Sequence, residues 1–408
     1  MTPTIVETWI YPYTECVQHF RSGDYRIQWE VTMKRIVYVG IDVHSTNFTF
    51  CSLEPVFGGD DRFFAKVQTQ PGCKSVEKYI ANLRKQLPYE FDVICGYEAG
   101  CLGYTLMRQL EDKGIKCLVL APSTISVQNG KRRKSDRRDA ENIARNMANN
   151  SCSYVHPPTR DDEQVKDYIR MRDDHKAALK KVKQQINAFC LRHGHQYPGK
   201  SKWTIAHMKW LRALDLDPLD TEILNEYLLT YEYQVDRIEQ FDARIEDLAS
   251  MEAYEEKVHK LRCFLGIETV SALALITETG DFERFRKGNL YAAYLGLVPG
   301  EDSSADDINH LRISKAGNVH LRKLLTEASQ SICKGQIGHK SKALKARQRG
   351  NDSAVIAYAD RANERMRRKY YHMIQRGKAR NIAVTAVSRE LACFVWGMMT
   401  GNINKALA

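Results

Sequence analysis

Two segments near the middle of the chain carry apolar residues at heptad spacing, and they restrict the fold more than any other feature. Between residues 165 and 189, and again between 231 and 248, the positions of this seam step by threes and fours, with polar interruptions at Arg172 and His175 in the first segment. The intervening YPGKSKWTIAHMKWLRALDLDPLD holds two prolines and little periodicity. We therefore expect residues 158–257 to form two long helices, either as an antiparallel coiled coil within one chain or as a seam with a partner chain.

Before these helices, the chain has the pattern of a mixed α/β domain. From residue 36 the runs IVYVGIDV, FTFCSLEPV and RFFAKVQT are β-branched or aromatic and are broken by turn residues. Further on, helical spacing alternates with the strand-like runs FDVICGYEAG and IKCLVLAP. We predict a mixed sheet flanked by helices over residues 34–157. Residues 1–33 show no clear period and are assigned to an N-terminal extension.

The last part of the chain, residues 258–408, has mostly helical patterns and is predicted to be a mostly helical C-terminal domain. Two apolar helical pieces around Gly266 and Gly280 resemble a helix-hairpin-helix, a module whose glycine turn presents backbone N–H groups to phosphate. An ordinary packed helix pair has the same pattern, so both interpretations stay open.

The charge balance favours a polyanionic partner over a small acidic metabolite. The chain has 61 Lys and Arg against 50 Asp and Glu, for a formal charge of +11. No apolar run approaches the roughly 18 residues that span a bilayer. The N-terminus also lacks the basic and then apolar layout of a signal peptide. We expect a cytoplasmic protein without a membrane partner.

The segment KRRKSDRRDAEN combines a basic cluster with two carboxylates. Asp136 and Asp139 are three positions apart, so on a helix capped by Ser135 they share a face and can hold a divalent ion next to a bound phosphate. Aspartates in a first helical turn are also common as partners of the helix dipole. The cations assigned to nucleic-acid binding are Lys131, Arg132, Arg133, Lys134, Arg137 and Arg138.

Two further acids each end a predicted strand: Asp42 in YVGIDVHS and Glu98 in ICGYEAG. A ribonuclease-H-like sheet needs strand-end acids and a helical Asp pair to converge on two metal ions. Each strand-end acid alone is more often a turn residue. Together with Asp136 and Asp139, their order along the chain predicts a site for Mg²⁺ or Mn²⁺.

Basic and aromatic residues alternate near the C-terminus, in RANERMRRKYYHMIQRGKAR. This interleaving is typical of nucleic-acid contacts, although a solvated helix face looks similar. We predict contacts from Arg367, Arg368 and Lys369, and from Arg312 and Lys315 in LRISKAGN.

The eleven cysteines are scattered singly, without a CxxC pair, which favours reduced and mostly buried thiols. One cluster, CLRHGH, offers Cys190, His193 and His195 as possible zinc ligands. The usual second pair of ligands is absent from this cluster.

Several segments, in this order, resemble the DEDD transposases of the insertion-sequence family numbered one hundred and ten: GIDVHS, YEAGCLGYTLMRQL, KSDRRDAENIAR, LRHGHQYPGKSKWT, GDFERFRKGNLYAAYLGLVPGEDSS and RISKAGNVHLRKLL. The resemblance runs from about residue 35 to the C-terminus. It implies a RuvC-like domain, a coiled coil and a C-terminal transposase domain. It also implies site-specific DNA recombination in a bacterial or archaeal cytoplasm, with the enzyme on the nucleoid when active.

The resemblance further implies the partners and the acidic site. A structured bridge RNA transcribed from the element would pair with both target and donor DNA. Position by position, Asp42, Glu98, Asp136 and Asp139 match the acidic tetrad of the family.

The family also uses a serine nucleophile in a loop after GLVP. Here that loop is EDSSADD, in which Ser304 is the better match and Ser303 the fallback. A serine hydroxyl that attacks a phosphodiester conserves the bond energy in a covalent phosphoserine, so strands can be exchanged and resealed. The family usually has Ser followed by Gly and basic residues, whereas this chain has Ala305, Asp306 and Asp307. These acids would lower activity or supply further metal ligands.

The tetrad and the serine lie about 165 residues apart, with the predicted helical pair between them. We therefore expect composite sites shared between protomers of a homodimer or homotetramer. Two other classes stay open: a RuvC-like endonuclease that hydrolyses branched DNA without joining strands, and a catalytically silent scaffold that binds nucleic acid.

Overall fold

The computed structural model describes residues 14–16, 31–33, 35–56, 59–64, 66–100, 102–125, 136–301 and 310–403. The chain forms two compact units, residues 1–157 and residues 158–408, and each is described by itself. Within the predicted N-terminal extension, β1 (Thr14–Cys16) pairs antiparallel with β2 (Val31–Met33).

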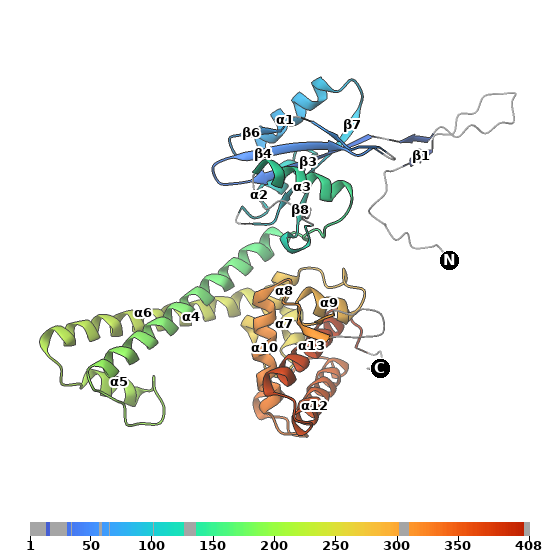
Figure 1. Ribbon diagram of the computed structural model, residues 1–408. Coiled ribbons are helices and arrows are strands. Elements are labelled where there is room, and N and C mark those ends of the chain that lie inside the picture. The colour runs from blue at the N-terminus through green and yellow to red at the C-terminus, as the bar shows by residue number, and fades with distance from the viewer. Residues whose placement is uncertain are drawn as a thin grey trace. The chain divides into compact units, whose positions relative to one another are not determined.

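A six-stranded mixed sheet forms the centre of the first unit (Figure 1). Its strands are β3 (Arg35–Val43), β4 (Phe48–Glu54), β5 (Arg62–Phe63), β6 (Val67–Thr69), β7 (Phe91–Glu98) and β8 (Lys116–Leu120). The order across the sheet is β5-β4-β3-β7-β8, and β6 also pairs with β4. β3 is antiparallel to β4 and parallel to β7, which is parallel to β8. The predicted mixed sheet is thus confirmed, although RFFAKVQT forms two short strands instead of one.

The two faces of this sheet carry different helices, and residue parity decides which side chain faces which helix. Odd-numbered residues such as Val39, Ile41 and Tyr97 are buried in one core with α1 (Cys73–Gln86) and α2 (Thr105–Glu111). On the other face, Tyr38, Leu118 and Leu120 pack with α3 (Asp136–Ala148). The short 3₁₀ helix η1 (Pro122–Thr124) follows β8.

Glycines let α3 lie directly on the backbone of the central strands. A Cβ atom at Gly40 would lie 2.1 Å from Ala140 O, and one at Gly96 would lie 2.2 Å from Met147 Sδ. Only glycine leaves room for so close an approach of helix and sheet. Because Gly40 and Gly96 face α3, the residues two positions further along each strand face α3 as well.

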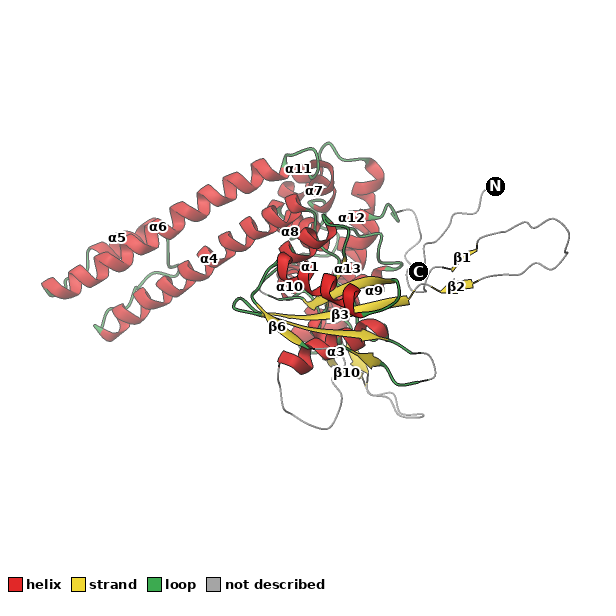
Figure 2. Ribbon diagram, turned by 90° about the horizontal axis from the view of Figure 1, so that it is seen from above, coloured by secondary structure: helices red, strands yellow, loops and turns green. Residues whose placement is uncertain are grey.

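Two long helices begin the second unit: α4 (Arg160–Arg192) and α6 (Pro218–Ala249). They run side by side in Figure 2, and their side-chain contacts are antiparallel, since Tyr168 lies against Phe241 whereas Phe189 lies against Tyr227. At the far end, α5 (Ile205–Arg212) closes a small core around Leu211, Ile186 and Leu224. The predicted antiparallel pair therefore forms within one chain, and a regular supercoil stays a prediction.

The rest of the second unit is mostly helical, as predicted. Its elements are α7 (Glu255–Leu261), α8 (Thr269–Thr279), α9 (Gly288–Tyr294), β9 (Pro299–Glu301), β10 (His310–Ile313), α10 (Val319–Lys334), α11 (Lys342–Gln348), α12 (Ser353–Gln375) and α13 (Arg380–Met399). One apolar core joins these helices to the near ends of α4 and α6 through Val165, Ile169 and Ile245.

α13 has the length and composition of a membrane-spanning helix, and it is the one helix among the described residues that does. Val387, Leu391 and Val395 on this helix are fully buried in the core of the second unit. This burial accounts for its apolar character in the same way as for other core helices.

The predicted helix-hairpin-helix corresponds to α7, the turn at Gly266 and α8. Gly266 has φ 87°, and a Cβ there would lie 2.4 Å from Ala328 O on α10. The N–H of Leu265 in the same turn donates to Asn363 Oδ1 at 3.1 Å. This turn is used in packing against α10 and α12, and its role in phosphate binding stays a prediction.

Candidate metal centre

Neighbouring parallel strands bring Asp42 and Glu98 to the same edge of the sheet. Ile41 on β3 pairs with Tyr97 on β7, so the acid that follows each of them lies at the same level. By parity, both acids face α3, because Gly40 and Gly96 two positions earlier do so. The sheet thus directs the two strand-end acids of the predicted tetrad to one face.

The first turn of α3 supplies the other two acids. α3 begins at Asp136, and Asp136 and Asp139 both lie in its first turn. The close approach of Ala140 O to Gly40 fixes this turn beside the end of β3, where Asp42 lies. The positive end of the helix dipole also favours carboxylates at this position.

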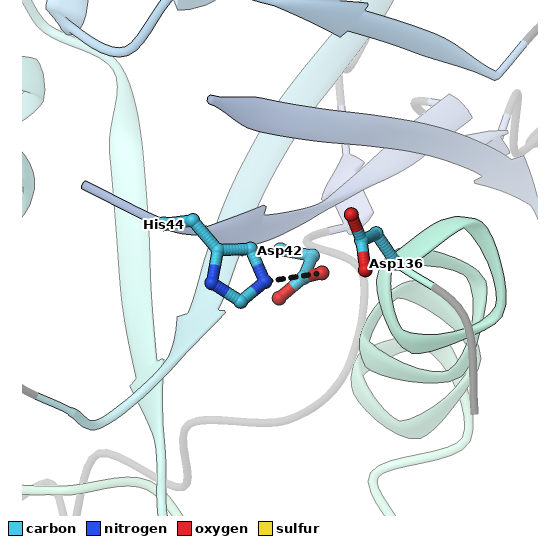
Figure 3. Close-up of side chains that lie close together, drawn as sticks. All are labelled: Asp42, His44 and Asp136. Carbon is cyan, nitrogen blue, oxygen red and sulfur yellow. Dashed lines mark ion pairs between the residues drawn. The ribbon is translucent and has the colours of Figure 1, made fainter. Parts of the chain in front are cut away.

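Three side chains form the candidate metal centre, called the metal centre below: Asp42, His44 and Asp136 (Figure 3). Their ligand atoms all lie within 4.8 Å of one another. His44 Nε2 is 3.3 Å from Asp42 Oδ2, which is an ion-pair distance. In Figure 3, Asp42 lies between His44, from the turn after β3, and Asp136, from the start of α3.

The electrostatics of Asp42 show that its carboxylate lacks full compensation. Burial raises the pKa of Asp42, and the charges of Asp139 and Asp136 raise it further, while His44 lowers it. Asp42 Oδ2 is buried and has no hydrogen-bond partner. A buried, unsatisfied carboxylate oxygen beside other acids is unfavourable unless a cation joins it.

This donor set fits a divalent cation. Carboxylate oxygens from Asp42 and Asp136 are ligands that Mg²⁺ and Mn²⁺ prefer, and the imidazole of His44 is a further donor. An ion bound there would neutralise the acids and polarise a phosphate oxygen. Glu98 and Asp139 are adjacent by sheet register and helix position, but they are not members of the close group.

Ion pairs fasten the middle and second half of α3 to residues beside β5 and β6. Arg145 lies 3.2 Å from Glu141 and 3.5 Å from Asp61, and Lys66 also pairs with Glu141. The hydrogen bonds from Lys66 and Arg145 outweigh burial and lower the pKa of Glu141. Arg145 also covers the ring of Phe63 at 4.8 Å. These contacts help to hold the acids of α3 against the sheet.

His44 is the residue of this centre that the sequence did not predict. It stands two positions after Asp42 in GIDVHS, outside the strand, where a polar side chain is usually a turn residue. The signal was present in the sequence, because an imidazole two positions after a strand-end acid can return to the same side of the sheet.

Cys190, His193 and His195, weighed in the sequence as possible zinc ligands, do not form a group of ligands in the structure. Cys190 is 5% exposed and belongs to the core at the far end of α4, whereas His193 Nδ1 pairs with Asp220 at 3.3 Å. Among the described residues, the metal centre is the one group in which three or more potential ligand atoms lie within 4.8 Å of one another.

The predicted nucleic-acid contacts lie in different surroundings. Arg137 and Arg138 are exposed on α3, and Arg312 and Lys315 are exposed at and after β10. A groove of about 670 Å³ is lined by Ile337, Arg365, Arg368, Lys369, Tyr371, His372, Gln375 and Glu390. The cations Lys131, Arg132, Arg133 and Lys134 lie outside the described residues.

The prediction that Arg367 contacts nucleic acid is wrong. Its side chain is buried, and its guanidinium donates to the backbone carbonyls of Gln336 at 2.8 Å and His339 at 2.6 Å. It therefore ties the segment after α10 to α12 instead of facing a nucleic acid.

The predicted nucleophiles, Ser304 and Ser303, and the neighbouring Ala305, Asp306 and Asp307 lie outside the described residues. The strands on either side of this loop pair antiparallel, with Glu301 opposite His310 and Pro299 opposite Ile313. Arg322 supports the backbone nearby by donating to Leu295 O at 2.8 Å.

Comparison with known proteins identifies the family. A family model described as Transposase IS116/IS110/IS902 family matches residues 258–344. A second model described as Transposase, for the DEDD transposases of IS110, matches residues 39–193. A solved structure of RuvC from Thermus thermophilus aligns with 29% of this chain and 99% of its own, with a TM-score of 0.22 and 11% identity.

Two relatives match over most of their length. The putative transposase y4qE of Sinorhizobium fredii is 32% identical over 366 residues, which cover 89% of this chain and 88% of the relative. The transposase for insertion sequence element IS1533 of Leptospira borgpetersenii is 31% identical over 355 residues, which cover 84% of this chain and 97% of the relative. The chain therefore belongs to the IS110 family of insertion-sequence transposases and is a DNA transposase with a DEDD domain.

Proposed function

We propose that this transposase is an RNA-guided, site-specific recombinase that cuts and rejoins DNA through a covalent phosphoserine intermediate and depends on a divalent cation. The observation that carries the metal dependence is the convergence of Asp42 and Asp136 on one point, with a buried Asp42 oxygen that lacks a hydrogen-bond partner. Glu98 and Asp139 would complete the tetrad from the adjacent strand and the same helical turn.

In this proposal Ser304 is the nucleophile and Ser303 the fallback. Ser304 Oγ attacks the scissile phosphorus and loses its proton to solvent. The bond from phosphorus to the leaving DNA oxygen breaks, and that oxygen takes up a proton. In the second step, the hydroxyl of another strand attacks the phosphoserine, and Ser304 leaves with a proton. The bound metal would supply charge stabilisation at the phosphate. Asp42 and Asp136 would hold it in place.

The exposed cations are proposed to hold the nucleic acids. Arg137 and Arg138 flank the metal centre, so they would guide the scissile strand towards it. Arg312, Lys315, Arg368 and Lys369 would hold the backbone of DNA or of a bridge RNA, in the cytoplasm and on the nucleoid. Base pairing by that RNA, not side-chain readout, would supply most of the sequence specificity.

We also propose that the active assembly is a homodimer or homotetramer in which the tetrad of one protomer works with the serine of another. Mixing an Asp136→Asn variant with a Ser304→Ala variant should restore part of the activity. Recombination that stays absent in every mixture of the two variants would contradict a shared site.

Covalent trapping tests the chemistry. The full-length protein is incubated with Mg²⁺, the RNA transcribed from the non-coding DNA beside the reading frame, and DNA that carries the insertion-sequence end and its target. A protein–DNA adduct should form and should disappear with Ser304→Ala. The control Ser314→Ala, at an exposed serine just after β10, should keep it.

Other outcomes point to the competing classes. Strand cleavage without an adduct or rejoined product would support a hydrolytic endonuclease. Unchanged nucleic-acid binding with no strand cleavage, in the wild type and in the double variant Asp136→Ala/Asp139→Ala alike, would support a silent scaffold. An adduct that forms equally well without the RNA would contradict guidance.

A further inference from the structure

We propose that His44 is a direct metal ligand of this transposase and that its imidazole shifts the preference of the centre from Mg²⁺ towards Mn²⁺. The inference rests on the proposed metal-dependent function and adds a residue outside the acidic tetrad. The four acids of the tetrad offer only oxygen ligands, so His44 would add a nitrogen ligand to the site.

The first argument is the distance between donor atoms. His44 Nε2 lies 3.3 Å from Asp42 Oδ2, and both lie within 4.8 Å of an Asp136 oxygen. Two ligands about 2.1 Å from one ion and at a right angle to each other are about 3 Å apart. The distance between His44 Nε2 and Asp42 Oδ2 is therefore close to that of neighbouring positions in one coordination sphere, and an Asp136 oxygen lies within 4.8 Å of both.

The second argument is the incomplete satisfaction of Asp42. His44 Nε2 lies at ion-pair distance from Asp42 Oδ2, yet this buried oxygen has no hydrogen bond of good geometry. A carboxylate oxygen can accept more than one partner. The same oxygen can therefore bind a cation that His44 also coordinates.

The third argument is the backbone that carries His44. β3 and β4 pair up to Val43 and Phe48, and the N–H of His44 donates to Asn47 O at 3.0 Å. This hairpin turn fixes the main chain of His44 relative to Asp42. The side chain is 52% exposed, so an ion and a phosphate oxygen can reach it from solvent.

The chemistry of the donors decides the preferred ion. Mg²⁺ binds almost entirely through oxygen ligands and keeps several waters, whereas imidazole is a good ligand for first-row transition ions. A site with two carboxylates and one imidazole should therefore bind Mn²⁺ more tightly than a site with carboxylates alone.

Pulsed electron paramagnetic resonance of the full-length protein loaded with Mn²⁺ tests the inference without any activity measurement. The bound ion should show a ¹⁴N coupling that is lost in His44→Ala and kept in His156→Ala, an exposed histidine of the same unit. Labelling the histidines with ¹⁵N should change the coupling accordingly. Bound Mn²⁺ without this coupling would overturn the role of His44 and leave the metal centre intact.

Calorimetric titration of the same variants gives a second, quantitative test. His44→Ala should weaken Mn²⁺ binding about tenfold and Mg²⁺ binding much less. His44→Asp should restore the affinity for Mg²⁺ while the ¹⁴N coupling stays absent, which guards against a folding defect. Equal losses for both ions would contradict the inference. Failure of the wild type to bind either ion would instead overturn the proposed metal-dependent function.

Discussion

His320 Nδ1 lies 2.6 Å from Glu278 Oε1, although the two residues are 42 positions apart and belong to α10 and α8. The other ring nitrogen of His320 is 3.0 Å from Asp173 Oδ2 on α4. Arg170 on α4 adds two hydrogen bonds of 3.1 Å to the same Glu278 carboxylate. This cluster joins the long helix α4 to the start of α10, just after the strand that borders the loop of the predicted nucleophile.

The stability of the second unit should depend on His320 in a pH-dependent manner. The hydrogen bonds to Asp173 and Glu278 raise the pKa of His320 from 6.5 to about 9. Its contribution is therefore fully present below pH 6.5 and is lost as the pH rises through about 9. His320→Gln should lower the free energy of unfolding by about 3 kcal/mol at pH 6. The difference between variant and wild type should shrink above pH 9 in thermal or urea unfolding.

Glu278 and Asp173, the two acids of the cluster, should make the stability of the second unit fall at low pH. Burial alone would raise their pKa, but hydrogen bonds from His320 and neighbouring arginines lower the pKa of both Glu278 and Asp173 to about 2. Their contribution is present above about pH 4.5 and is lost as the pH falls towards 2. His259→Gln, at an exposed histidine of α7, is the matched control for His320→Gln. An equal loss of stability in His320→Gln and His259→Gln would exclude a special role of the cluster.

Gly40→Ala should disable the metal centre without changing any of its ligands. The added methyl group would collide with Ala140 O and push α3 away from β3, at a cost of about 3 kcal/mol. Asp136 would move with the helix, so Mn²⁺ binding should fall together with the melting temperature. In Gly59→Ala the new Cβ would lie 3.3 Å from one side-chain atom of Val56 and more than 4 Å from α3, and both quantities should stay near the wild-type values.

The neighbouring residues Arg367 and Arg368 should have separable roles. Arg367→Ala removes the side-chain donor from the carbonyls of Gln336 and His339, leaves the first with only the N–H of His339, and should destabilise the protein by about 2 kcal/mol. Arg368 is exposed and pairs with Glu364 at 2.8 Å, so Arg368→Ala should leave the melting temperature unchanged. If this surface holds a phosphate backbone, Arg368→Ala should also reduce the salt dependence of DNA or RNA binding by about one ion.

The acids of the tetrad should contribute unequally to binding of the first ion. Asp42→Asn and Asp136→Asn each replace a charged oxygen ligand of the close group by an amide. Each should weaken Mn²⁺ binding by about tenfold or more, which is the usual effect of changes around a bound metal ion. Glu98→Gln should weaken it by no more than about threefold, because Glu98 lies outside that group. Equal effects in all three variants, measured by calorimetry, would show that Glu98 moves into the site when the ion binds.

The position of the acids could be predicted from the sequence because it follows from local rules. Asp42 and Glu98 each end an apolar run, and the alternation of side chains along a strand directs both to one face. Asp136 and Asp139 share a helical turn by spacing alone. The sequence could not show how closely the two groups approach, because this depends on the contact between Gly40 and Ala140, which are 100 positions apart.

The errors have equally local causes. Arg367 looked like a surface cation because it stands in a basic run, but Tyr358, Ala359, Ala362 and Met366 form the buried seam of α12, and Arg367 adjoins that seam. The spacing of these apolar residues already indicated its burial. His44 was missed because an exposed histidine after a strand has no pattern of its own, and its significance comes only from the atoms around it.

The α4–α6 pair is held by a separate apolar core at each end, one around Ile169 and Ile245 and the other around Ile186 and Leu224. Between these anchor points the two helices act as a spacer of fixed length. Removing one heptad from each helix would bring the end of the pair that carries α5 about 10 Å nearer to helices α7–α13 and preserve both cores. The length of the α4–α6 pair can therefore change in units of one heptad without altering the apolar core at either end of the pair.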